Sequence, residues 1–151
     1  MTADVSRIIE KTLAKEGVYS NDVNDPGGET HWGISKRAYP TVDIRNLTRD
    51  GAKLIYERDY YAPLGFDGTE RIDYRWKLFD VAVNMGISIA QRFKRLVAPL
   101  LPDYDAALQE LADMQTERYC WLATRNPALQ NFLRGWLKRA NDLGADLLDG
   151  V

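Results

Sequence analysis

The sequence contains only one cysteine and one histidine among its 151 residues. A disulfide within the chain is therefore impossible, which fits synthesis in a reducing compartment. Cys120 lies in the apolar stretch RYCWLA, and we expect a buried, inert thiol because free cysteines are usually buried. One cysteine and one histidine also argue against a zinc site, and no nucleophile-elbow motif accompanies His31 as part of a catalytic triad.

Basic charge and long apolar runs are scarce as well. The net charge is −2 and the pI about 5.4, whereas proteins that bind nucleic acid in bulk usually carry a basic excess. No window reaches the roughly 18 apolar residues of a membrane span. The N-terminal segment MTADVSRIIEKTLAKEG lacks the continuous apolar core of a signal peptide. We therefore expect no nucleic-acid partner, no stable membrane insertion and no signal peptide.

Alternation typical of strands never extends beyond four or five residues, so the fold is predicted to be mainly α. Apolar residues at one-turn spacing predict helices over residues 4–15, 48–61, 71–85, 88–99 and 101–127, and a last helix after Pro127. Thr48 and Ser88 are the expected N-caps of two of these helices. Residues 18–33 show no helical period and predict a long ordered loop or a short hairpin, which in a compact domain is usually functional.

The segment EGVYSNDVNDPGGETHWGI, residues 16–34, concentrates acidic and turn-forming residues. Its first residue, Glu16, follows the first predicted helix, where unpaired carbonyls carry partial negative charge. That environment favours the neutral carboxylic acid, which a general acid requires. An exposed Glu16 paired with Lys11 or Lys15 is the alternative interpretation.

Asp25 and Thr30 lie further along the same loop, which is long enough to fold back towards Glu16. Two carboxylates flanking a cleft are the minimum that a glycoside hydrolase needs, and a threonine hydroxyl can orient a water. Alternatively, both residues only make turn bonds to nearby backbone. Counted from Asp22, the twelfth position of an EF-hand would be Gly33 instead of glutamate, so an EF-hand is excluded while other calcium loops stay open.

Four segments resemble glycoside hydrolase family 108, the phage-type N-acetylmuramidases and their bacterial relatives. EGVYSNDVNDPGGETHWGIS resembles the opening signature of the family, and NLTRDGAKLIYERDYY and LFDVAVNMGISIA resemble two later segments. The tail QTERYCWLATRNPALQNFLRGWLKR is similar to the small predicted peptidoglycan-binding domain usually fused behind it. The resemblance implies a lysozyme-like helical core with an N-terminal active-site loop or hairpin. It assigns residues 1–97 to the catalytic module and 98–151 to a C-terminal helical appendage, packed on it as one globule.

The activity that this resemblance implies is cleavage of the β-1,4 bond between N-acetylmuramic acid and N-acetylglucosamine in peptidoglycan. The family's catalytic acid falls on Glu16, and the Asp and Thr of its loop fall on Asp25 and Thr30. Glu29 is a competing carboxylate that could instead shape the loop. The candidate substrate-binding residues are Tyr19, Tyr61 as an aromatic platform for sugar stacking, and Asn84.

Asn84 has two interpretations, contact with a substrate acetamido group or hydrogen bonding of loop backbone within the core. Val18 stands where the family usually has Gly, and a β-branched residue is poor at positive φ. Either that position needs no left-handed geometry, or the turn is strained.

We expect no cofactor and no metal, and the resemblance implies peptidoglycan glycan strands as the partner. The expected setting is synthesis in the bacterial cytoplasm and action at the cell wall or periplasm, in cell lysis or wall remodelling. An endolysin released through a holin pore is the simplest case, and a secretion-linked bacterial relative is the alternative. Two rival functions stay open. One is a non-catalytic peptidoglycan-binding protein that keeps the scaffold. The other is a lytic transglycosylase, which needs the acid but no water-activating aspartate.

Overall fold

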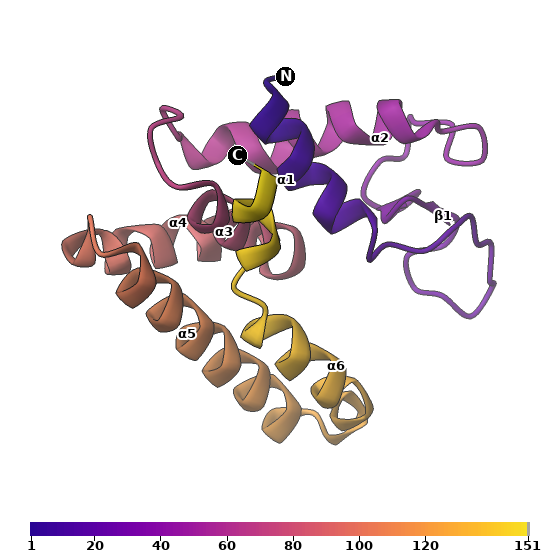
Figure 1. The fold of residues 1–151 in the computed structure, drawn as a ribbon. Coiled ribbons are helices and arrows are strands. Elements are labelled where there is room, and N and C mark those ends of the chain that lie inside the picture. Colours follow the sequence, from indigo (N-terminus) through magenta and orange to yellow (C-terminus); the bar gives the residue numbers. More distant parts are fainter. Residues whose placement is uncertain (151) are drawn as a thin grey trace. The chain divides into compact units, whose positions relative to one another are not determined.

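The computed structural model describes residues 1–150 (Figure 1). Contacts divide the chain into two compact units, Met1–Ala62 and the part from Pro63 onward. The α-helices are α1 (Ala3–Leu13), α2 (Arg49–Tyr56), α3 (Ile72–Met85), α4 (Ile87–Val97), α5 (Tyr104–Arg125) and α6 (Gln130–Asn141). The only strands in this part of the chain are β1 (Thr30–His31) and β2 (Ile34–Ser35), so the predicted mainly α fold is confirmed.

The predicted domain boundary after residue 97 coincides with the end of α4, inside the second unit. As the boundary of a catalytic module it stays a prediction. None of the helices within residues 1–150 is both long enough and apolar enough to cross a membrane.

Helix α1 begins where Thr2 caps it, since the Thr2 hydroxyl accepts a hydrogen bond from the Val5 amide at 3.3 Å. Its predicted apolar stripe, Val5, Ile8, Ile9 and Leu13, is buried. The α-helix ends at Leu13, earlier than the expected end at residue 15. Two tighter backbone turns follow, from the Lys15 amide to the Thr12 carbonyl and from the Glu16 amide to the Leu13 carbonyl. They bring Glu16 to the end of the helix, as expected.

Helix α2 begins after Thr48, whose hydroxyl accepts from the Gly51 amide at 3.1 Å, so this predicted cap is confirmed. The helix continues into a π-helical turn over Glu57–Tyr61. Glu10 of α1 ties the two helices together through ion pairs with Arg49 and Lys53. The hydrogen bond from Lys53 lowers the pKa of the Glu10 carboxyl, and the bond from Arg49 adds to this.

The second unit is built around α3, in which residues 72–82 are all buried. Helix α3 packs against α4 and α5. Gly86, at φ +96°, ends α3 and is also the N-cap of α4. The predicted cap at Ser88 is therefore wrong. Ser88 lies within the first turn of α4, because a glycine at positive φ joins the two helices with no intervening loop.

Helices α5 and α6 run side by side, joined by a short turn over Pro127–Leu129 (Figure 1). Lys77 of α3 is fully buried, and its ammonium donates to the carbonyls of Ala140 and Asp142 at the end of α6, at 2.6 and 2.9 Å. Cys120 is exposed, so the expected buried thiol is wrong. The buried face of α5 passes through Tyr119 and Ala123, and Cys120 is rotated away from it.

Candidate functional site

The first unit contains a minimal hairpin in which Thr30 pairs with Ser35 and His31 with Ile34. Its two-residue turn, Trp32-Gly33, has φ of +53° and +76°. Two positive φ values are the type I′ pattern, which usually carries Asn-Gly or Asp-Gly. Trp32 is the only non-glycine residue with positive φ among residues 1–150. A bulky residue in this region is strained, and such strain tends to occur at functional sites.

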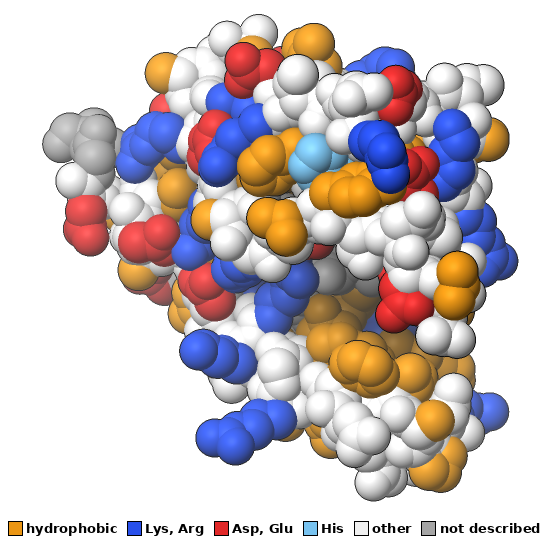
Figure 2. All heavy atoms as spheres, turned by 90° about the vertical axis from the view of Figure 1, so that its right-hand side faces the viewer, with side chains coloured by type: hydrophobic (Ala, Val, Ile, Leu, Met, Phe, Trp, Pro, Cys, Tyr) orange, Lys and Arg blue, Asp and Glu red, His pale blue; other side chains and the backbone are white. Residues whose placement is uncertain are grey.

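Several contacts hold Trp32 in this conformation. Its indole N–H donates to the Leu47 carbonyl at 3.1 Å, and its ring stacks on His31 with centroids 5.1 Å apart. The Arg49 guanidinium lies over the indole, 5.5 Å from the ring centre. The Tyr56 hydroxyl donates to the Trp32 carbonyl at 3.0 Å. Figure 2 shows the imidazole of His31 at the surface, with apolar and basic side chains around it.

The hairpin turn lies directly against Glu16. A β-carbon built on Gly33 would be 2.8 Å from Glu16 Oε2 and 2.3 Å from the Tyr56 hydroxyl oxygen. Only glycine leaves room for both oxygens at this position. The fold therefore brings the half-buried Glu16 against the turn at the far end of the loop. The expected approach of Asp25 and Thr30 to Glu16 stays a prediction.

Asp25 and Thr30 make the local bonds that were the alternative interpretation. Asp25 Oδ1 accepts from the Gly27 amide at 2.8 Å, and the Thr30 hydroxyl donates to the Gly28 carbonyl at 3.1 Å. Ser35 pairs with Thr30 across the hairpin, and a β-carbon built on Gly27 would be 3.2 Å from Asp25 Oδ1 and 3.5 Å from Ser35 Cβ. Asp25 is exposed, and its Oδ2 accepts no hydrogen bond within the described residues. One carboxylate oxygen thus shapes the turn and the other stays available to a substrate or water.

Tyr19 organises the opposite side of the loop. Its hydroxyl donates to Glu29 Oε1 at 2.7 Å and accepts from Arg45 Nε at 3.4 Å, and its ring meets His31 edge-on. Glu29, the competing carboxylate, is thus bonded to Tyr19 and shapes the loop. Val18 is 79% exposed and is not at positive φ, so its position never needed a glycine.

The two remaining predicted residues differ from expectation. Tyr61 is only 8% exposed, so its ring has little free face, and the expected role in sugar stacking is not supported. Asn84, on α3 in the second unit, is exposed and donates to the Asp80 carbonyl of its own helix at 2.7 Å. Hydrogen bonding of loop backbone in the core is therefore wrong for Asn84. Asn84 lies one turn after the buried Asp80, past the part of α3 that is buried.

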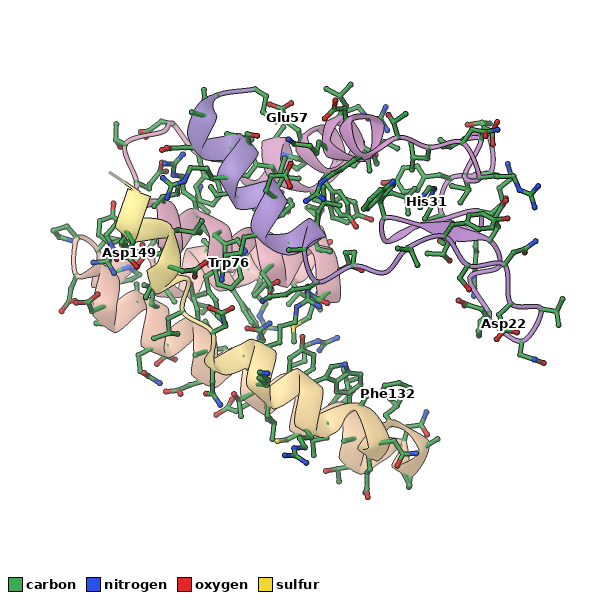
Figure 3. The ribbon with its side chains drawn as sticks, turned by 45° about the vertical axis from the view of Figure 1, so that its right-hand side comes forward. Asp22, His31, Glu57, Trp76, Phe132 and Asp149 are labelled. Carbon is green, nitrogen blue, oxygen red and sulfur yellow. The ribbon has the colours of Figure 1, made fainter. Side chains whose placement is uncertain are left out.

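A cation site in the loop finds no support. Asp22 bonds the Asn24 amide at 2.8 Å, and Figure 3 shows it at the loop's outer end, away from His31 on the hairpin. No group of three or more histidine, cysteine, aspartate or glutamate side chains placed to hold a metal occurs among residues 1–150.

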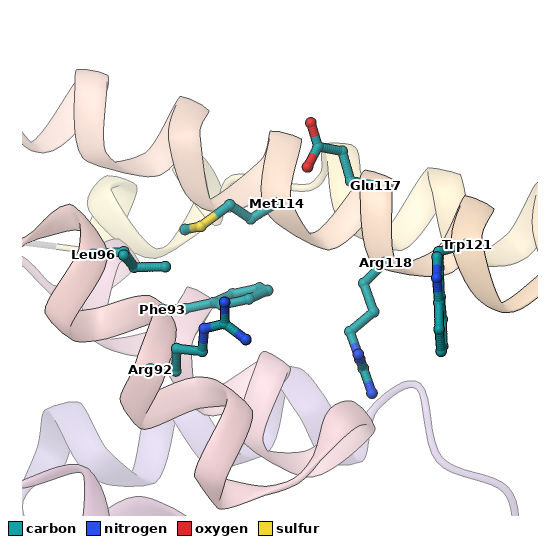
Figure 4. A pocket seen from close by; sticks show the side chains of 7 residues that line it. All are labelled: Arg92, Phe93, Leu96, Met114, Glu117, Arg118 and Trp121. Carbon is teal, nitrogen blue, oxygen red and sulfur yellow. The ribbon is translucent and has the colours of Figure 1, made fainter.

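The second unit has a separate open groove of about 430 Å³ between α4 and α5 (Figure 4). Phe93, Leu96 and Met114 supply apolar surface, and Arg92 and Arg118 supply positive charge. Glu117 is the only carboxylate that lines it. Because glycoside hydrolysis generally uses a pair of carboxylates, this groove does not have the composition of an active site.

The protein is thus mainly helical, and the carboxyl of Glu16 lies against a strained hairpin. Its fold is similar to that of SagA from Brucella abortus, with a TM-score of 0.73 over 96% of this chain and 94% of that chain, at 21% identity. This likeness confirms the expected mainly α, lysozyme-like fold class. No match is found among the curated proteins.

The sequence model of the family described as glycosyl hydrolase 108 matches residues 9–86, just over half of the chain. The protein therefore belongs to this family. Membership supports a glycoside hydrolase, a peptidoglycan hydrolase of the lysozyme-like kind. The matched region contains the candidate site residues Glu16, Asp25, Thr30 and Asn84.

Two contributors to the site, Tyr56 and the Trp32-Gly33 turn, were not predicted as such. Tyr56 reads only as an inward-facing residue of a helical stripe, and its polar contact depends on where the hairpin lies. The dipeptide Trp-Gly lacks the Asn or Asp that marks a type I′ turn. Gly33, a residue that readily adopts positive φ, was the one indication of this turn in the sequence.

Proposed function

We propose that the protein is an N-acetylmuramidase that hydrolyses the β-1,4 bond between N-acetylmuramic acid and N-acetylglucosamine, with Glu16 as its general acid. The observation that carries this proposal is the position of Glu16. Its carboxyl is half-buried and packed on Gly33 of a strained hairpin, inside the family-matched region. Fixing an acid against rigid backbone is what proton transfer to a leaving oxygen requires.

In the proposed reaction Glu16 gives its proton to the glycosidic oxygen as the bond to the muramic acid C1 breaks. A water attacks C1, and a carboxylate either takes its proton or stabilises the cationic transition state. Asp25 is the candidate for this second role because its Oδ2 is not engaged within the described residues. The Thr30 hydroxyl donates a hydrogen bond to the Gly28 carbonyl, so its oxygen can accept a hydrogen bond from the water. Tyr19 and Asn84 are the proposed substrate contacts.

The biological setting is part of the proposal. The resemblance of residues 98–151 to a wall-binding domain supports attachment to peptidoglycan, and release through a holin pore is the simplest route to the wall. Lysis of cells that make the protein only when a holin is present would support an endolysin. Lysis without the holin would point to another export route and to wall remodelling.

The test combines clearing of purified peptidoglycan with mass spectrometry of the products. Wild type is expected to release fragments with reducing N-acetylmuramic acid ends. Glu16→Gln should lose about 10²–10⁴-fold in rate, the usual contribution of a general acid. Asp22→Asn is the matched control, an exposed carboxylate at the outer end of the same loop.

Each alternative function has its own signature in this assay. Products with 1,6-anhydro ends would identify a lytic transglycosylase. Binding to peptidoglycan with no clearing by wild type would identify a non-catalytic wall-binding protein. Equal clearing by wild type and Glu16→Gln would show that Glu16 is not the acid.

A further inference from the structure

His31 is the single histidine of the chain, and one of its two ring nitrogens is already bonded. Its Nδ1 lies 3.1 Å from the Ile44 carbonyl oxygen. A carbonyl can only accept, so Nδ1 carries a hydrogen and donates it to this bond. In the neutral imidazole the other nitrogen, Nε2, is then an acceptor that offers its lone pair.

The lone pair of Nε2 is open to a ligand. Within residues 1–150, Nε2 bonds neither a side chain nor the backbone. It is not buried either, because none of the buried polar atoms that lack a hydrogen bond in this part of the chain belongs to His31. Figure 2 shows the imidazole at the surface. A hydrogen-bond donor from outside the protein can therefore reach Nε2.

Three contacts hold the imidazole in one orientation. The bond to Ile44 fixes one edge of the ring. The Trp32 indole stacks on one face, with centroids 5.1 Å apart and 13° between the planes, and Tyr19 meets the ring edge-on at 5.7 Å. Rotating the ring would break these contacts together. The direction of Nε2 is thus set before any ligand arrives, which lowers the entropic cost of binding.

His31 also lies on the hairpin against which the candidate acid packs. On β1 it pairs with Ile34, and the turn between them, Trp32-Gly33, is the one that Glu16 contacts. A glycan that receives a proton from Glu16 would therefore pass close to this hairpin. N-acetylated sugars carry acetamido N–H and hydroxyl groups, which are the donors that Nε2 can accept from.

We propose that His31 is a substrate-binding residue whose Nε2 accepts a hydrogen bond from an N-acetylated sugar of the glycan strand. The identity of this ligand rests on the proposed function. A purely structural role would need Nδ1 and the ring but not Nε2, so experiments that address Nε2 alone separate the two roles.

Nitrogen NMR reads Nε2 directly, since a chain with one histidine gives one pair of imidazole nitrogen signals. The ¹⁵N-labelled Glu16→Gln protein, which should leave the probe uncleaved, is observed at alkaline pH, where imidazoles are neutral. The probe is a soluble N-acetylglucosamine oligomer. We expect Nδ1 to carry the hydrogen before the oligomer is added, and the Nε2 signal to move upfield as it binds. An unprotonated Nδ1, or an Nε2 signal that does not move, overturns the inference.

His31→Gln and His31→Asn form a matched pair, because both lose the aromatic ring and its stacking. The Gln amide reaches the position of Nε2 and can still accept, whereas the shorter Asn amide reaches only the position of Nδ1. In the Glu16→Gln background, the Kd for the oligomer should be about 3–10-fold higher with His31→Asn than with His31→Gln, the range of one hydrogen bond. In the active protein the same ratio should appear in KM for peptidoglycan, with equal kcat. Equal Kd values for the two variants would contradict the inference.

The NMR result also separates this inference from the proposed hydrolysis. An upfield shift of Nε2 in a protein whose wild type clears no peptidoglycan would support sugar binding at His31 and reject the hydrolase. Clearing by wild type together with an unmoved Nε2 signal would keep the hydrolase and reject the role of His31.

Discussion

Replacing Gly33 by alanine tests the geometry on which the site depends. The added methyl would lie 2.3 Å from the Tyr56 oxygen and 2.8 Å from Glu16 Oε2, closer than side chains tolerate. The residue must also keep φ near +76°, a conformation that L-residues avoid. Gly65 provides a matched control, because it has φ of +63° but no atoms within 4 Å of the added methyl.

The expected costs follow from these two terms. A left-handed conformation costs an alanine about 1–2 kcal/mol, and this applies to Gly65→Ala and Gly33→Ala alike. Relieving the close contacts in Gly33→Ala must also move the Tyr56 hydroxyl off the Trp32 carbonyl, which adds about 1 kcal/mol for a lost hydrogen bond. Gly33→Ala should thus lose about 2–3 kcal/mol of unfolding free energy, against about 1–2 kcal/mol for Gly65→Ala.

Urea denaturation followed by circular dichroism measures both unfolding free energies, and peptidoglycan clearing measures both activities. Gly33→Ala should lose about 100-fold in kcat, since a misplacement of about 1 Å can cost that much. Gly65→Ala should stay within about twofold of wild type, because it lies outside the site. Equal stability and equal activity of the two variants would refute the close packing of Glu16 on the hairpin.

Three further outcomes are expected. Val18→Gly should leave clearing within about twofold of wild type because Val18 is not at positive φ, and a tenfold gain would contradict this. Cys120 should react with a thiol reagent as fast in the native protein as in the unfolded one, whereas slow native reaction would place it in the core. Lys77→Met should lower unfolding free energy by about 2–4 kcal/mol in urea, because the carbonyls of Ala140 and Asp142 lose a buried cationic donor. An unchanged midpoint would contradict that estimate.

The parts of the fold that were predictable are those that local chemistry decides. The cap at Thr48 needs only a side-chain oxygen and a free amide three residues on, so it is visible in the sequence. The apolar stripe of α1 was read correctly because its residues recur at one-turn spacing. Ser88 was misassigned because a glycine at positive φ, Gly86, can cap without a side chain.

The errors at Cys120 and Tyr61 have a different cause. Periodicity gives the faces of a helix but not which face meets a neighbour, so a cysteine one position from the buried Tyr119 was placed inside. Tyr61 is the last residue of the π-helical turn Glu57–Tyr61, where the α-helical period that was used to place side chains no longer applies. Neither effect can be read from residue types alone.

In the candidate site, too, features set by neighbours in the sequence were predictable, and features set by distant contacts were not. Glu16 could be proposed from the sequence because the end of a helix is a local electrostatic environment. The place of Tyr56 beside the hairpin could not, because its hydroxyl bonds a carbonyl 24 positions away in the chain. The strained Trp32-Gly33 turn contacts both residues, because the Trp32 carbonyl accepts from Tyr56 and Gly33 lies against Glu16. A type I′ turn with asparagine would be easier to form, but it would lack the indole that bonds Leu47 and stacks on His31. A costly residue kept in a turn that touches the candidate acid is better explained by the position it gives Gly33 than by stability.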